Sequence, residues 1–160
     1  MTPPPPLSPR LTLLLRLCLG ALATCLVLLN PLAASASLLH LAGPEPGDLG
    51  VREGHLAACA TAAHCSRAEW PVADPRAALA NLLPAVLALD GVAVVDTCAD
   101  YLHATVSSRM FGFVDDLELH AEVERGVLEA RSVSRLGDSD LGVNARRLES
   151  LRRALVRLDS

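Results

Sequence analysis

The sequence contains no lysine and few aromatic residues. All 14 of its basic residues are arginine, a bias that we attribute to genomic composition and not to function. The aromatic side chains are those of Trp70, Tyr101, Phe111 and Phe113. So few aromatic residues do not provide the stacking platform on which proteins hold single-stranded nucleic acid.

The sequence also lacks an excess of positive charge. Its formal net charge is −4. Residues 1–36 contain Arg10, Arg16 and no acidic residue, so the rest of the chain would carry a charge of −6. A nucleic-acid-binding domain normally presents a basic patch. The charge therefore argues against nucleic acid as the main partner.

The common catalytic motifs are absent. The chain has no Gly-x-Ser-x-Gly elbow, no phosphate-binding Walker loop and no His-Glu-x-x-His helix. Asp115 and Asp116 are neighbours on a predicted strand, so they would point to opposite faces and would not form an acid–base pair. We predict no catalytic residue and no cofactor.

The N-terminal segment has the pattern of a targeting sequence. Arg10 and Arg16 precede an uncharged apolar run over residues 17–29, which is too short for a typical membrane span. Ala34-Ser35-Ala36 matches a cleavage site, so we predict a signal peptide over residues 1–36. An uncleaved membrane anchor over residues 11–29 is the alternative. Either arrangement would export the folded part of the chain.

Residues 37–73 are predicted to form an extended arm with a cysteine pair. Cys59 and Cys65 are close in sequence, and an oxidising compartment would favour a disulfide between them. Cys98 is left over, and we expect it to be buried. His55 and His64 add ligand types that zinc accepts, but their spacing with the two cysteines matches no standard site. We therefore predict no metal.

Residues 74–160 are predicted to form an α+β domain. Asp74-Pro75 is a typical helix start, and Pro84 is expected to kink or split that helix. Four strands follow, over residues 92–97, 101–108, 113–123 and 127–134, and a helix capped by Asn144 ends the chain. The order α-β-β-β-β-α predicts an antiparallel four-stranded sheet with two helices packed on one face.

The third predicted strand alternates apolar with polar residues, which is typical of a half-buried strand with a polar outer face. Pairing of Val123 with Leu128 across the following hairpin would place Asp116 opposite Arg135.

The segment Arg131 to Arg147 has the most unusual chemistry in the chain. Arg146 and Arg147 fall in the first turn of the predicted helix, where positive charge opposes the helix dipole unless an anion is bound there. We predict an anion-binding site formed by Arg109, Arg131, Arg135, Ser139, Asn144, Arg146 and Arg147. The alternative is that Asp138 or Asp140 supplies the negative charge and the arginines form internal salt bridges.

Four stretches of the sequence resemble one known family. They are Gly50-Val-Arg-Glu-Gly54 before the cysteine pair, Asp74-Pro75, the stretch from Ser108 to Asp116, and the stretch Arg131-Ser-Val-Ser-Arg-Leu-Gly-Asp-Ser-Asp-Leu-Gly-Val-Asn144. Together they resemble the domain of unknown function 1499 family, over residues 49–158. This resemblance implies a cysteine pair at Cys59 and Cys65, and it names no activity and no catalytic residue. The family occurs in bacteria, including cyanobacteria, and in plastid-bearing eukaryotes. With the targeting segment, we expect export to a periplasm or a thylakoid lumen.

Three functional hypotheses follow. The leading one is an exported accessory or binding domain whose partner is an anionic small molecule, a lipid head group or an acidic protein surface. The second is a hydrolase of a small substrate, with Ser134 or Ser139 as the nucleophile and His103 or His120 as the base. We expect both histidines to be exposed. The third is a structural component of a membrane-associated complex, with the arginines paired internally.

Overall fold

The computed structural model describes residues 41–158, which lie within one compact unit formed by residues 36–160. The predicted signal peptide, the alternative anchor and the predicted cleavage site before Ser37 lie outside the described residues. Among residues 41–158, no helix is both long enough and apolar enough to cross a bilayer.

The central element is an antiparallel sheet in the order β3-β7-β6-β5-β4. Its strands are β3 (Cys65–Pro71), β4 (Val92–Thr97), β5 (Tyr101–Ser107), β6 (Val114–Glu122) and β7 (Val127–Ser134). The α+β class is confirmed, but the sheet has five strands where four were predicted. The additional strand, β3, comes from the predicted arm and pairs with β7 over its whole length. Its sequence contains no Val, Ile or Thr and only one residue of high strand propensity, Trp70, so the signal for a strand there was weak.

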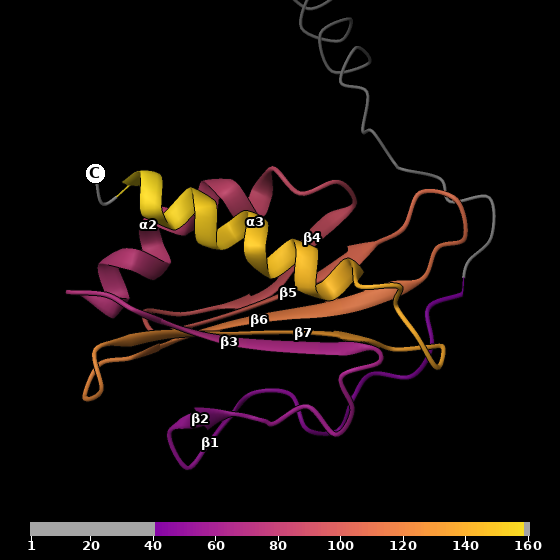
Figure 1. Ribbon diagram of the computed structural model, residues 1–160, viewed down its shortest axis with the longest axis horizontal. Helices are drawn as coiled ribbons and strands as arrows, with labels where there is room; N and C mark the ends of the chain where they lie inside the picture. Colours follow the sequence, from indigo (N-terminus) through magenta and orange to yellow (C-terminus); the bar gives the residue numbers. More distant parts are fainter. Residues whose placement is uncertain (1–40, 159–160) are drawn as a thin grey trace, which may run out of the picture. The chain divides into compact units, whose positions relative to one another are not determined.

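Both helices, α2 (Pro75–Leu87) and α3 (Val143–Leu158), cover the same face of the sheet, as predicted (Figure 1). Leu82 of α2, Leu151 of α3 and Leu117 of β6 are almost completely buried between the helices and the sheet. This layer is the hydrophobic core.

Helix α2 begins at the predicted residue and is not split. The Asp74 side chain accepts hydrogen bonds from the backbone N–H groups of Arg76 and Ala77. The helix continues through Pro84, which lies on the exposed side between buried Leu82 and Val86. Packing of these two neighbours against the sheet holds the last turn in place despite the lost backbone hydrogen bond.

The cap of α3 differs from the prediction. Asp140, and not Asn144, accepts hydrogen bonds from the N–H groups of Gly142 and Asn144, each at 2.8 Å. Asn144 lies inside the first turn, and its side chain points into the protein. The sequence offered two residues able to cap, and only the path of the preceding loop decides between them.

The opposite face of the sheet is covered by the segment 41–64, which includes the small hairpin of β1 (Val51–Arg52) and β2 (His55–Leu56) (Figure 1). As a result, β6 is buried on both faces, and its predicted polar outer face does not meet solvent. His103 and His120, predicted to be exposed, are only 6% and 8% exposed. Alternation in the sequence distinguished the two faces correctly but did not reveal that the arm covers the polar one.

The hairpin between β6 and β7 is shifted by two residues from its predicted register. Glu122 pairs with Val127, and Asp116 therefore lies opposite Val133. A shift of two residues keeps every side chain on its predicted face. The predicted ion pair between Asp116 and Arg135 therefore forms between diagonal neighbours.

Candidate functional site

The arm-side face of the sheet carries a layer of buried charged side chains. Asp116, Glu118 and Glu129 have no exposed surface, and Arg131 is 3% exposed. Burial of an unpaired charge is costly, so each of these groups needs a partner of opposite charge and further hydrogen bonds. The arm and the neighbouring strands supply them.

Arg131 connects the sheet with the arm. Its guanidinium donates to Glu118 Oε2 at 2.9 Å on β6 and to Asp48 Oδ2 at 2.8 Å on the arm. Glu118 also accepts from the Tyr101 hydroxyl and from the backbone N–H of Gly50. Burial, together with the hydrogen bond to Glu118, raises the pKa of Tyr101, so its hydroxyl stays protonated and continues to donate.

Arg135, just after β7, makes the same kind of connection between a buried carboxylate of β6 and the arm. It donates to both carboxylate oxygens of Asp116, at 2.8 and 2.9 Å, and to Glu45 of the arm at 3.4 Å. His103 forms a further hydrogen bond with Asp116 at 2.8 Å. Burial alone would raise the pKa of Asp116, but the hydrogen bonds from His103 and Arg135 outweigh it and hold that pKa below its usual value.

Glu129 forms the third connection between the sheet and the arm. Its carboxylate accepts from Arg67 of β3 at 2.8 Å and from the backbone N–H of Leu56 at 2.8 Å, and it contacts the His55 ring at 3.0 Å. Hairpin β1–β2 is therefore attached to the sheet through this buried carboxylate and through the His120 ring, which contacts the carbonyl oxygen of Gly54 at 3.1 Å.

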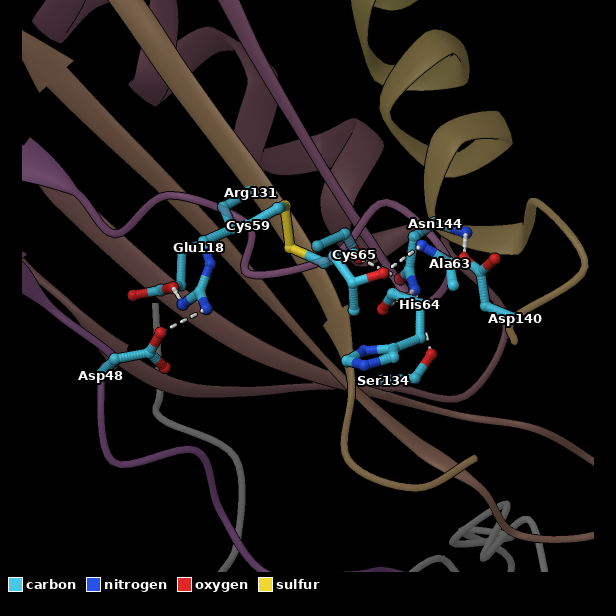
Figure 2. Close-up of a disulfide and its surroundings, with 12 residues drawn as sticks. Asp48, Cys59, Ala63, His64, Cys65, Glu118, Arg131, Ser134, Asp140 and Asn144 are labelled. Carbon is cyan, nitrogen blue, oxygen red and sulfur yellow. Dashed lines mark hydrogen bonds and ion pairs between the residues drawn. A yellow bond between two sulfur atoms is a disulfide. The ribbon is translucent and has the colours of Figure 1, made fainter. Parts of the chain in front are cut away.

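The predicted disulfide between Cys59 and Cys65 is present, and its loop packs against the start of α3 (Figure 2). The carbonyl oxygen of Ala63 accepts from the backbone N–H of Asp140. The carbonyl oxygen of His64 accepts from the N–H of Ser134 and from the Asn144 side chain. The disulfide loop and the arginine-rich segment thus form one hydrogen-bonded unit.

Asn144 organises a second polar cluster, on the helix side of the sheet. Its side-chain oxygen accepts from Ser132 and from Arg147, each at 2.6 Å. Arg147 also donates to Asp115 Oδ2 at 2.6 Å. Asp115 and Asp116 therefore serve opposite faces of the sheet, as predicted.

A cavity of about 290 Å³ lies between the arm and β7. Its wall includes Glu45, Asp48, His64, Arg131 and Arg135. Two buried nitrogen atoms in these residues, His64 Nδ1 and Arg131 Nε, have no hydrogen-bond partner among the described residues. Buried polar atoms without partners are rare in folded proteins and often mark a site for water, an ion or a ligand.

A wider groove of about 550 Å³ runs between β3 and α3. Its charged side chains, Glu69, Glu149 and Arg152, are between one-third and two-thirds exposed. They meet solvent and need no ligand to satisfy them. We therefore place the candidate site in the smaller cavity.

The structure divides the seven residues of the predicted anion site. Arg131 and Arg135 both line the cavity. Asn144 and Arg147 lie on the helix side, and Asn144 touches the cavity-lining residues His64 and Ser134 through hydrogen bonds. The remaining three, Arg109, Ser139 and Arg146, are exposed in loops or at the start of α3.

Sequence reasoning missed Glu45, Asp48 and His64 as members of the site. Glu45 and Asp48 lie in a Pro- and Gly-rich stretch that indicated only a linker. His64 was considered only as a metal ligand. The only signal in the sequence was the presence of two acidic residues in this linker, which could have been considered as partners for the arginines.

Neither the hydrolase hypothesis nor the alternative of a zinc site is supported by the geometry of the described residues. Within residues 41–158, no hydrogen bond joins a serine side chain to a histidine ring, and no three side chains are arranged to hold a metal ion. Cys98, expected to be buried, is exposed and donates to Asp100. It lies in the turn between β4 and β5, at the edge of the sheet, where no further element covers it.

Residues 34–155 match the model of a family described as protein of unknown function (DUF1499). The chain belongs to this family. The match confirms the resemblance carried by the four sequence stretches and includes both the cavity and the disulfide. No curated protein and no solved structure matches the chain.

Proposed function

We propose that this member of the family is an exported accessory domain that binds a small anionic molecule in the cavity between the arm and β7. A molecule bearing carboxylate groups is the chemical class that suits the site. The observation that carries the proposal is that exposed carboxylates of the arm occupy one side of each cavity arginine.

Each of the two guanidinium groups has two kinds of partner. Glu118 and Asp116, on the sheet, are fully buried, whereas the side chains of Asp48 and Glu45 are 46% and 61% exposed. The buried pairs are fixed by the fold. The carboxylates of the arm are partly solvated, so a ligand carboxylate could take their place while each guanidinium keeps its buried partner on the sheet.

The two buried nitrogen atoms without partners support the same location. Both atoms belong to residues of the cavity wall, Arg131 and His64, so the unmet hydrogen-bonding capacity lies beside the proposed site. The volume is at the lower end of the range for ligand pockets, which favours a small metabolite.

Two features support export as part of the proposal. The apolar run over residues 17–29 and the small residues 34–36 are typical of a signal peptide. The disulfide between Cys59 and Cys65 is of a kind that persists in oxidising compartments such as a periplasm or a thylakoid lumen.

The test is a thermal-shift titration of the chain beginning at Ser37, with mono- and dicarboxylates, phosphate and sulfate. A ligand that binds only the folded state raises Tm by mass action. Asp48→Asn with Glu45→Gln removes both competing carboxylates, and we expect it to tighten anion binding roughly threefold to tenfold. Asp90→Asn with Glu149→Gln changes the net charge equally but alters exposed carboxylates outside the cavity, and should leave binding unchanged.

The proposal fails if no anion raises Tm in the wild-type chain or in the arm variant. Equal tightening by both double variants would show a general charge effect and would also contradict it.

A second candidate function is a structural component of a membrane-associated complex. It is favoured by the ion pairs of Arg135 with Asp116 and of Arg147 with Asp115, which are internal and whose side chains are at most 13% exposed. The absence of any anion response, together with strong destabilisation by Arg147→Gln, would favour this candidate over ligand binding.

A further inference from the structure

Exposed apolar side chains gather at one end of the sheet. The loop over residues 108–113 carries Met110, Phe111 and Phe113, which are 62%, 44% and 40% exposed. The loop after β7 carries Leu136 and Leu141, which are 38% and 84% exposed. The two loops are neighbours, because β6 and β7 pair at this end and the N–H of Arg135 donates to the carbonyl oxygen of Val114.

Leu141 is the most unusual of these residues. It has a φ of 53°, a conformation that costs a leucine free energy and is normally adopted by glycine or asparagine. Its side chain is almost completely exposed. Its backbone is held locally, since its N–H donates to Ser139 Oγ at 3.3 Å and its carbonyl oxygen accepts from Arg146 at 2.9 Å. The turn therefore holds an apolar side chain out in solvent, which is typical of a surface that meets a partner.

Phe111 and Phe113 support the same interpretation. Their ring centroids are 5.7 Å apart, so they form one protruding apolar unit. The chain is poor in aromatic residues, yet it places two of them in a single exposed loop. Aromatic and long aliphatic side chains on protruding loops suit insertion into the interfacial layer of a bilayer.

The charges at this end are nearly balanced. Arg109 forms an ion pair with Asp90 at 3.2 Å, and both side chains are at least three-quarters exposed. Arg146 donates to the carbonyl oxygen of Leu141, and Asp138 is exposed in the same loop. Apolar insertion, and not attraction to negative lipid, is therefore the driving force to expect.

The chain also enters the fold at this end (Figure 1). A Cβ atom on Gly43 would lie 2.6 Å from Leu136 Cγ, so the first described residues pack against the second loop. The sequence before them contains the apolar run over residues 17–29, and the intervening residues 30–40 span at most about 40 Å when extended. A bilayer that holds or receives this run would be within reach of the loops.

We propose that the end formed by residues 108–113 and 136–143 docks on a lipid bilayer, with Phe111, Phe113 and Leu141 inserted into the interfacial layer. This inference is independent of the proposed anion cavity, because none of the three residues proposed to insert lines it.

The experiment is flotation of the chain beginning at Ser37 with phosphatidylcholine vesicles and with vesicles that also contain phosphatidylglycerol. This chain retains the described residues 41–158, which contain the sheet and both helices. We expect binding to both vesicle types, with little dependence on salt. Phe111→Ser with Leu141→Asn should lower the partition coefficient roughly tenfold or more, since two large apolar side chains no longer insert.

The matched control is Leu87→Ser with Val156→Ser, two helix residues that are 55% and 60% exposed. We expect this control to bind vesicles as the wild type does. Asparagine tolerates the conformation of residue 141, so the loop variant should keep its Tm while losing vesicle binding.

Three outcomes would overturn the proposal. One is the absence of vesicle binding by the wild-type chain, and another is an equal loss in the loop and control variants. The third is self-association without vesicles that the loop variant abolishes, which would assign this end to contact between copies of the chain. The anion titration contains no vesicles, so its outcome does not affect this test.

Discussion

At the scale of single residues, the charged layer shows why polar alternation was misleading. Asp116 and Glu118 occupy positions that normally face solvent in a half-buried strand. Here each is fully buried and accepts at least three hydrogen bonds. Removing one partner of a buried ion pair typically costs about 3–5 kcal/mol, because the other charge is left uncompensated. Substitution of a buried acidic residue or of its arginine partner is therefore expected to destabilise the fold.

The first prediction concerns Asn144, which has no exposed surface and connects Ser132, Arg147 and the carbonyl oxygen of His64. Asn144→Ala leaves these groups without a shared partner. We expect the free energy of unfolding to fall by about 2–4 kcal/mol, since each buried polar group left unsatisfied costs about 1–3 kcal/mol. Urea unfolding monitored by circular dichroism measures this change.

The matched control is Asn81→Ala, at an exposed position of α2. It should change the free energy of unfolding by less than about 0.5 kcal/mol. A similar small effect at Asn144 would mean that the cluster contributes little to stability.

At the scale of elements, the arm is held by a few connections to the sheet and has little core of its own. Strand β3 adds to β7, the hairpin β1–β2 bonds to Glu129, and the disulfide loop bonds to the start of α3. The turn residues and the linker composition predicted an extended arm, and most of the arm has no regular secondary structure. Its role as a cover for the charged face depends on contacts between residues more than 60 positions apart.

The second prediction concerns the disulfide loop. Cys59→Ser with Cys65→Ser should lower the free energy of unfolding by about 2 kcal/mol, because the unfolded chain regains the entropy that the closed loop had removed. Hydrogen exchange at the amides of Ser134 and Asp140 should accelerate more than elsewhere, because these amides donate to the loop. Cys98→Ser, at an exposed free thiol, serves as the control and should have neither effect.

Uniform acceleration of exchange across the sheet in the disulfide variant would contradict a local role. It would indicate that the loop stabilises the whole fold and not the start of α3.

At the scale of the whole molecule, the sheet separates two interiors with different chemistry. The helix side is a hydrophobic core, and the arm side is a layer of ion pairs with a cavity at one end. Loss of the hydrophobic core would unfold the protein under any conditions. The charged layer, in contrast, makes stability depend on pH.

The third prediction is a loss of stability in acid. The hydrogen bonds of His103 and Arg135 outweigh burial and hold the folded-state pKa of Asp116 below its ordinary value of 3.8. A carboxyl group with a lowered folded-state pKa stabilises the fold above its unfolded-state pKa. That contribution is lost as the pH falls below about 4 and through the lower folded-state value. Urea unfolding at pH 7, 5, 4 and 3 should show this decrease.

Asp116→Asn removes the titrating group and tests the assignment. The variant should be less stable than the wild type at pH 7 but should lose less stability between pH 5 and pH 3. An unchanged acid-induced loss would assign the effect to other carboxyl groups, such as Asp140, whose backbone hydrogen bonds also outweigh burial and lower its pKa.

The sequence by itself determined the α+β class, the two helices, four of the five large strands, the disulfide and the family. These features depend on local signals: the Asp74-Pro75 cap, the alternation along residues 113–134, the helical spacing of Leu148, Leu151 and Leu155, and a short cysteine spacing. It also identified the arginine-rich segment as chemically unusual.

Only the tertiary structure decided where the side chains of that segment lie. Two of its arginines face the arm, one faces the core, and one is exposed, because strand pleating and the turn at Gly137 direct them to different sides. The sequence also did not predict that the arm covers the polar face of the sheet. That arrangement depends on ion pairs between residues far apart in the sequence, such as Asp48 and Arg131. Local patterns specify elements, whereas the pairing of buried charges is decided only when the elements meet.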